Sequence, residues 1–140
     1  MDVVFLVGRV LFALIFVASG FMAHLAQARE MAEYARSQGA PAPGLMVPLS
    51  GVVIIGGGLS VALGVYADLG ALLLAGFAFS VAFFMHAFWR EQDPQMQQNQ
   101  MAHFMKNMAL VGGALVLFYT FNQLQADAGL SITDPLFDRA

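Results

Sequence analysis

The chain has 140 residues, of which 59% are hydrophobic and only 11% charged, and its formal net charge is −3. A soluble domain carries about 25% charged residues, so this composition excludes an ordinary water-soluble protein and predicts an integral membrane protein. The six basic residues are scattered, which excludes a nucleic-acid surface, and the lack of cysteine excludes disulfides, thiolate metal sites and iron–sulfur clusters.

Four apolar segments predict an all-α transmembrane bundle. They span about residues 3–25, 45–66, 69–89 and 105–124. Each is close to the roughly 20 residues that cross a hydrocarbon core, and backbone groups in lipid must be paired internally, which favours helices. The short connections leave no room for a second core, so we expect a single domain over residues 1–140. The first segment lacks the basic start of a signal peptide and is expected to be retained.

The first polar connection, residues 26–44, contains a short amphipathic stretch at residues 28–38. Met31, Tyr34 and Ala35 fall at helical spacing while the charged residues fall elsewhere. This pattern predicts a helix that lies in the membrane interface. A plain surface loop is the alternative.

The second and third segments are joined by only a few residues, so we expect a tight antiparallel hairpin. Asp68 is placed to cap the start of the third helix. Gly56, Ser60 and Gly64 recur every four residues and form one stripe of small side chains. Such stripes let helices approach closely in lipid, which predicts packing inside the bundle or between copies of the chain.

Basic residues predict the orientation in the membrane. The side that holds connections 26–44 and 90–104 carries Arg29, Arg36, Arg90 and Lys106, whereas the other side has only Arg139 and the embedded Arg9. By the positive-inside tendency, both connections are expected to face the cytoplasm. Arg9 lies about two turns inside the first helix. We expect it to extend to the headgroups of its own side or to pair with Asp2 or Asp68.

All three histidines are expected on the side of these two connections. His24 ends the first helix, His86 lies one turn before the end of the third, and His103 begins the fourth. Residues three and four positions apart share a helix face, which forms two groups at the same depth. The groups are His86, Trp89 and Arg90 on the third helix, and His103, Lys106 and Asn107 on the fourth. These six are the candidate cofactor-binding residues.

Three interpretations fit these groups, since ionisable residues at membrane depth indicate a functional site by default. In the first, aromatic rings near Trp89 accept a quinone while His86 or His103 donates a hydrogen bond to its carbonyl and carries protons. In the second, two histidines ligate haem, which nothing in their spacing selects. In the third, Arg90 and Lys106 reach the interface and the bundle is a cofactor-free anchor for another protein. No other metal site is predicted.

The chain resembles the DoxX family of small bacterial and archaeal membrane proteins over almost its full length. The matching residues are Gly8-Arg9, Phe16, Ser19-Gly20, His24, Tyr34-Ala35, Gly39, Pro41 to Pro43, Ser50-Gly51, Gly57-Gly58, Gly64, His86 to Trp89, Asp93-Pro94, Gln100, Phe104, Lys106-Asn107 and Gly112-Gly113. Members often carry a glutamate in the second helix a few residues before the paired glycines. Ile54 stands at that position here, which leaves the second helix wholly apolar.

The resemblance implies a four-helix inner-membrane protein linked to respiratory or sulfur redox metabolism. Some relatives are the membrane subunit of a thiosulfate:quinone oxidoreductase, and others act as scaffolds in oxidative-stress complexes. We therefore predict a membrane subunit of a redox complex that contributes a quinone site, with a cofactor-free anchor or scaffold as the alternative. The expected partners are the lipid bilayer, membrane or peripheral redox proteins, and further copies of the chain.

The sequence does not decide whether the chain takes part in an enzyme. It lacks a nucleophile elbow, a phosphate-binding glycine loop and a zinc-type HExxH motif. A catalytic role is therefore expected only as a subunit of a quinone-linked oxidoreductase. Small-solute transport is disfavoured, because the second helix offers no polar path.

Overall fold

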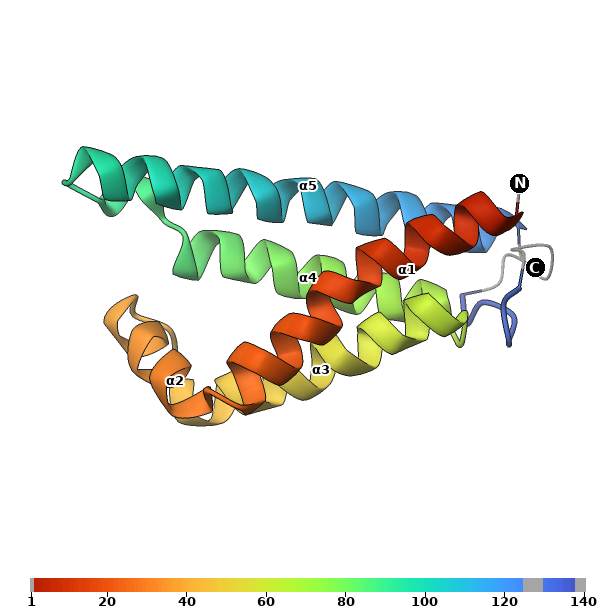
Figure 1. Ribbon diagram of the computed structural model, residues 1–140, viewed down its shortest axis with the longest axis horizontal. Helices are drawn as coiled ribbons and strands as arrows, with labels where there is room; N and C mark the ends of the chain where they lie inside the picture. Colours follow the sequence, from red (N-terminus) through yellow and green to blue (C-terminus); the bar gives the residue numbers. More distant parts are fainter. Residues whose placement is uncertain (1, 125–129, 138–140) are drawn as a thin grey trace.

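A computed structural model describes residues 2–124 and 130–137 of the chain, which form a bundle of helices (Figure 1). The elements are α1 (Asp2–Ser19), a π-helical segment η1 (Gly20–Leu25), α2 (Ala28–Ser37), α3 (Pro43–Leu63), α4 (Ala67–Met85), a 3-10 turn η2 (Phe88–Arg90) and α5 (Pro94–Leu124). The described residues contain no strand, which confirms the all-α prediction.

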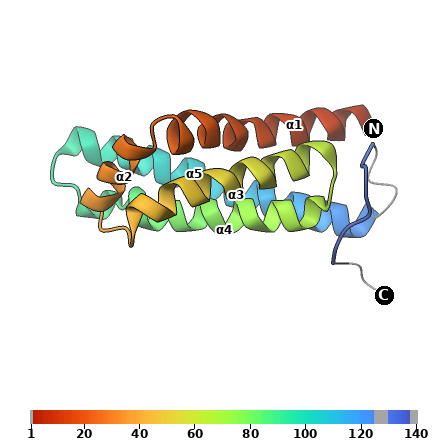
Figure 2. The ribbon, with the colours of Figure 1, turned by 90° about the horizontal axis from the view of Figure 1, so that it is seen from below.

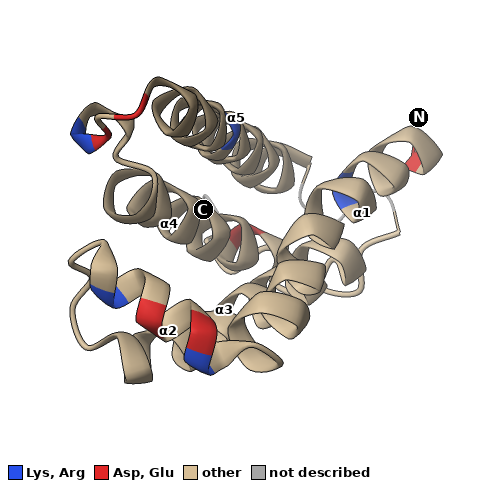
Figure 3. Cartoon of the chain, turned by 60° about the vertical axis from the view of Figure 1, so that its left-hand side comes forward, with Lys and Arg blue, Asp and Glu red and all other residues tan. Residues whose placement is uncertain are grey.

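Four helical segments of the described chain are long and apolar enough to cross a membrane. They are Asp2–Leu25, Pro43–Leu63, Ala67–Arg90 and Pro94–Leu124. This confirms the predicted transmembrane bundle by length and composition. Charged side chains gather on α2 and on the connection between α4 and α5, which lie at the same end of the bundle (Figure 3).

Helix α5 begins eleven residues before the predicted fourth segment, at Pro94 rather than at residue 105. The Asp93 side chain accepts a hydrogen bond from the backbone N–H of Met96 at 2.8 Å, and proline suits the first helical position. The polar residues that follow are mostly glutamines, which are good helix formers. At about 1.5 Å per residue, the 31 residues of α5 measure roughly 46 Å, so the helix extends past an apolar core of about 30 Å.

Helix α4 ends at Met85, earlier than the predicted residue 89. His86 has φ −125° and ψ 41°, which is outside the helical region. The chain then forms a tight turn held by backbone hydrogen bonds between residues three apart, such as the one from Arg90 N–H to the Ala87 carbonyl. The prediction that His86, Trp89 and Arg90 share one helix face is therefore wrong. The cause is this tight turn, which lets the chain reach the start of α5 within a few residues.

Helix α3 lies between α1 and α4 (Figure 2). A Cβ atom added at Gly58 would lie 2.7 Å from Val17 Cγ2 of α1, and one added at Gly57 would lie 3.1 Å from Leu74 Cδ2 of α4. Gly56 is exposed and has no heavy atom within 4 Å of such a Cβ. The paired glycines, rather than Gly56 of the predicted stripe, therefore allow the close packing inside the bundle.

Helix α2 packs onto the start of α3 and covers one end of the bundle. Ala32 and Ala35 are buried against Val47, with Met31 and Met85 at the edge of the cluster. A helix over Ala28–Ser37 confirms the helical interpretation of residues 28–38 over the alternative of a plain loop. The position of α2 in the membrane interface stays a prediction.

Arg9 is buried at the opposite end of the bundle, with only 1% of its surface exposed. Its Nη1 donates to Ser131 Oγ at 2.9 Å and its Nη2 donates to the Leu130 carbonyl at 2.8 Å. Its guanidinium also lies 5.7 Å and 5.9 Å from the ring centroids of Phe5 and Phe121. The expectation that Arg9 reaches the headgroups or pairs with a carboxylate is therefore wrong. The segment 130–137 covers it and supplies neutral oxygen acceptors instead.

Asp68 binds the same segment. Its carboxylate is fully buried and accepts backbone N–H bonds from Leu136 at 2.9 Å and Phe137 at 2.7 Å. Helix α4 begins after Tyr66, and no side chain caps it. The predicted capping role of Asp68 is therefore wrong, because its oxygens are used by residues 136 and 137. Arg139, which entered the prediction of orientation, lies outside the described residues.

We expect Gly58→Ala to destabilise the protein by about 1–3 kcal/mol, because the new methyl group would overlap Val17. Thermal unfolding in detergent measures this. Gly56→Ala is the matched control, since the added methyl meets open space and alanine favours a helix. Equal melting temperatures for the two variants would contradict the assignment of close packing to Gly58.

We expect Asp68→Asn to destabilise the protein by about 1–3 kcal/mol, because each buried N–H uses a different carboxylate oxygen and asparagine replaces one of them with an NH2 group that cannot accept. The loss should appear as a lower melting temperature and as faster proteolysis within residues 130–137. Asp134→Asn is the control, because Asp134 is exposed and its side chain bonds no described residue. If Asp68→Asn changed neither the melting temperature nor the rate of proteolysis, the two hydrogen bonds to Asp68 would not be what holds residues 130–137 in place.

Candidate functional site

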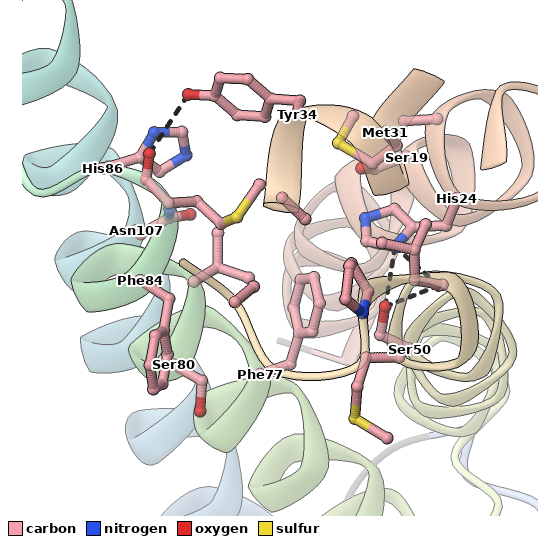
Figure 4. Close-up of a pocket in the computed structure, with 18 of the residues that line it drawn as sticks. Ser19, His24, Met31, Tyr34, Ser50, Phe77, Ser80, Phe84, His86 and Asn107 are labelled. Carbon is pink, nitrogen blue, oxygen red and sulfur yellow. Dashed lines mark hydrogen bonds between the residues drawn. The ribbon is translucent and has the colours of Figure 1, made fainter. Parts of the chain in front are cut away.

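A cavity of about 400 Å³ lies at the end of the bundle that α2 covers (Figure 4). Its walls come from α1, α3, α4 and α5, and its lining is mostly apolar, with Phe16, Phe77, Phe84 and Leu110 among the large side chains. The polar residues that line it are Ser19, His24, Tyr34, Ser50, Ser80, His86, Lys106 and Asn107. A pocket of about 300–1,000 Å³ with an apolar lining and few polar groups is typical of a small-molecule site.

The cavity follows from the way the helices diverge. Helices α3 and α4 converge at their short hairpin and separate toward α2 (Figure 1). Helices α1 and α5 have few contacts with one another among the described residues. Side chains from all four long helices therefore face a common space.

His24 enters the cavity from the π-helical segment Gly20–Leu25 at the end of the first span. Its Nδ1 lies 2.8 Å from Ser50 Oγ and 3.2 Å from the Val47 carbonyl. Ser50 Oγ itself donates to Val47 at 2.8 Å. His24 can come this close to α3 because Gly51 has no side chain, and a Cβ there would lie 2.7 Å from His24 Cβ.

His86 enters from the end of α4 and begins a chain of hydrogen bonds. Its Nδ1 lies 2.8 Å from Gln100 Oε1 of α5. Gln100 Nε2 donates to the Tyr34 hydroxyl of α2 at 3.0 Å, and this hydroxyl donates to the Met85 carbonyl at 3.3 Å. The chain of bonds joins α2, α4 and α5 around one wall of the cavity.

The predicted site residues divide into two sets. His86, Lys106 and Asn107 line the cavity, whereas Trp89, Arg90 and His103 do not. The imidazoles of His86 and His103 do meet as expected, stacked with centroids 5.0 Å apart. His103 itself is exposed.

The outer set belongs to an aromatic cluster on the surface of the bundle. Trp89 packs edge-on against Phe88 and Phe104, and Phe83 also contacts Phe104. Trp89 is 49% exposed, and Arg90 beside it is exposed as well. Such a cluster suits the aromatic belt of a membrane interface better than an enclosed binding site.

Asn107 has an unpaired polar atom in the cavity wall. The residue is only 6% exposed, and its Nδ2 has no hydrogen-bond partner among the described residues. An unpaired buried amide costs about 1–3 kcal/mol, so natural proteins rarely leave one without a function.

The sequence prediction missed four residues that shape the cavity. His24, Tyr34 and Ser50 line it, and Gln100 orients His86. His24 was recognised as lying on the same side as the other histidines but not as part of the site. Tyr34 lies on the apolar face of the predicted interfacial helix. Its hydroxyl is the one feature of the sequence that could indicate a polar role in the cavity. Among the described residues, no group of three or more His, Cys, Asp or Glu could hold a metal ion.

The comparisons with known proteins agree with this architecture. The DoxX family model matches residues 4–87 of the chain, so Phe88, Trp89 and the motifs from Asp93-Pro94 onward lie outside the matched range. The chain is also 33% identical, over 119 residues, to the protein named inner membrane protein YqjF of Escherichia coli (strain K12). The aligned region covers 85% of each protein. No solved structure matches the chain.

We expect Tyr34→Phe to loosen α2, because Gln100 Nε2 and the Met85 carbonyl both lose the hydroxyl that joins them. The amides of Ala28–Ser37 should exchange hydrogen about two to ten times faster, as expected for the loss of one or two modest hydrogen bonds. Tyr119→Phe is the control, since Tyr119 is exposed and its hydroxyl bonds no described residue. Unchanged exchange in Tyr34→Phe would show that the bonds do not hold α2.

Proposed function

The chain belongs to the DoxX family, and from that premise we propose that it is the membrane subunit of a redox complex and holds a quinone in the cavity covered by α2. The proposal places the protein in a bacterial inner membrane, as the name of its Escherichia coli relative suggests. The connections 26–44 and 90–104 would face the cytoplasm, with α2 in the interface. Partner subunits would carry the electron transfer that this bundle cannot perform alone.

The observation that carries the proposal is the unpaired Nδ2 of Asn107 in an apolar cavity. Nδ2 itself is covered in the cavity wall, so a ring oxygen of a quinone would accept a hydrogen bond from this amide once the side chain turns toward it, which would remove the cost of leaving it unpaired. The apolar and aromatic walls would contact the ring, and the splayed helices would leave an exit for an isoprenoid tail toward the lipid. An apolar, membrane-borne ligand with a polar head fits this arrangement.

Lys106 and the two cavity histidines supply the remaining chemistry. Lys106 lies at the rim of the cavity and is exposed, so its ammonium would favour negative charge on a reduced ring oxygen. His24 and His86 can accept or deliver protons. Trp89, Arg90 and His103 would stabilise the position of the bundle at the interface or contact a partner subunit. The exposed Gly56 offers a surface for association between copies of the chain.

A cofactor-free anchor is the second candidate, and one observation favours it. The chain of bonds from His86 through Gln100 to Tyr34 joins three helices, which is what a structural lock requires. In that function His86 serves to hold α4 and α5 together, and the cavity stays without a specific ligand. The two candidates predict different results for the same variants.

We expect protein purified in a mild detergent to retain quinone, and Asn107→Leu to retain about tenfold less, since it loses the buried donor. Mass spectrometry of the extracted lipids measures the quinone, and the same sample identifies co-purifying subunits. Gln97→Leu is the control, because Gln97 is exposed and lies outside the cavity. If no variant or wild-type sample retains quinone, while His86→Ala lowers the melting temperature, the protein is an anchor.

A further inference from the structure

We infer that the cavity prefers the reduced quinol to the oxidised quinone, because both of its imidazoles are held as hydrogen-bond acceptors. The inference rests on the proposed function and adds the redox state of the ligand. A quinone oxygen can only accept hydrogen bonds, whereas each quinol hydroxyl also donates one. The tautomers of His24 and His86 therefore decide which form is recognised.

The tautomer of His24 follows from its partners. The Val47 carbonyl lies 3.2 Å from His24 Nδ1 and can only accept, which places the proton of this contact on Nδ1. The Ser50 hydroxyl donates to the same carbonyl at 2.8 Å. The Ser50 oxygen, 2.8 Å from His24 Nδ1, must then accept a hydrogen bond from that nitrogen. A neutral His24 thus carries its proton on Nδ1. Its Nε2 is left as an acceptor, and no described residue donates to it.

The tautomer of His86 follows in the same way from a longer chain of bonds. The Met85 carbonyl accepts from the Tyr34 hydroxyl, so this hydroxyl accepts from Gln100 Nε2. The amide of Gln100 is thereby oriented with Oε1 toward His86, 2.8 Å from Nδ1. A neutral His86 also carries its proton on Nδ1 and leaves Nε2 as an acceptor, to which no described residue donates.

The two acceptors lie on opposite sides of the cavity, His24 beside α3 and His86 beside α5 (Figure 4). A ring with two hydroxyl groups in para positions presents donors in opposite directions. Asn107 Nδ2 can donate to an oxygen of either redox form and does not discriminate between them. Lys106 also only donates, so it can bond to an oxygen of either neutral form. The discrimination therefore comes from the two histidines.

Histidine-to-asparagine variants test this directly. In asparagine the side-chain nitrogen can occupy the place of Nδ1, so His24→Asn can keep the bond to Ser50 and His86→Asn the bond to Gln100, while each loses Nε2. Gln97→Asn is the control, because Gln97 is exposed, lies outside the cavity and its side chain bonds no described residue. Melting temperatures identify any variant that fails to fold, and the wild-type preference is measured without a variant.

The experiment measures binding of a short-tailed benzoquinol, and of the matching benzoquinone, to the purified protein under anaerobic conditions at neutral pH. We expect the quinol to bind at least about tenfold more tightly. Each cavity variant should lower quinol affinity about tenfold while changing quinone affinity less than about twofold, and Gln97→Asn should change neither.

Equal affinities for the two forms, or tighter binding of the quinone, would overturn the quinol preference. If that binding were still weakened by Asn107→Leu, the proposed quinone site would stand without it. Failure of both forms to bind would instead overturn the proposed function, and the preference with it. The two failures are therefore distinguishable in one set of titrations.

Discussion

The burial of Arg9 and Asp68 determines the shape of the bundle. A charge removed from water costs several kcal/mol unless hydrogen bonds or an opposite charge replace the lost solvent. Here neither charge pairs with the other. Arg9 is bound by Leu130 and Ser131, and Asp68 by the backbone of residues 136 and 137. One short segment thus binds both side chains at that end of the bundle, although Arg9 Nε has no hydrogen-bond partner among the described residues. At the α2 end, where the helices diverge around the cavity, no segment of the described residues binds two buried charged side chains in this way.

The polar groups at the α2 end have a different role. They do not neutralise charges, but determine which atom donates and which accepts in each hydrogen bond. Val47 and Met85 contribute backbone carbonyls, which can only accept hydrogen bonds. Each carbonyl fixes the direction of the bonds that lead to it, and so fixes the tautomer of one histidine. The imidazoles are therefore oriented before a ligand arrives, which lowers the cost of binding. A site of this kind recognises a pattern of donors and acceptors with little rearrangement of the protein.

The sequence was sufficient for the spans, because composition and length decide whether a helix can cross a membrane. The sequence was insufficient to predict the partners of a side chain when those partners are distant in the chain. Arg9 finds its partners 121 and 122 positions away, a separation that no periodicity reveals. The polarity of the glutamine-rich start of α5 is typical of a loop, but glutamine is also a good helix former, so polarity alone does not locate the start of this helix. The division of the site residues depended on where α4 ends. Trp89 and Arg90 turn outward with the 3-10 turn, whereas Asn107 on α5 faces the cavity.

Ile54 limits where protons can move. The side chain that stands in place of the glutamate found in many family members is fully buried in the apolar core with Phe16 and Leu74. The middle of α3 therefore offers no titratable group. If the cavity holds a quinol, its protons leave through His24, His86 or the exposed rim at Lys106. These groups lie at the end of the bundle that the distribution of basic residues predicts to face the cytoplasm. Proton release would thus occur on the side where a peripheral partner could collect the electrons, and the bundle need not conduct protons across the membrane.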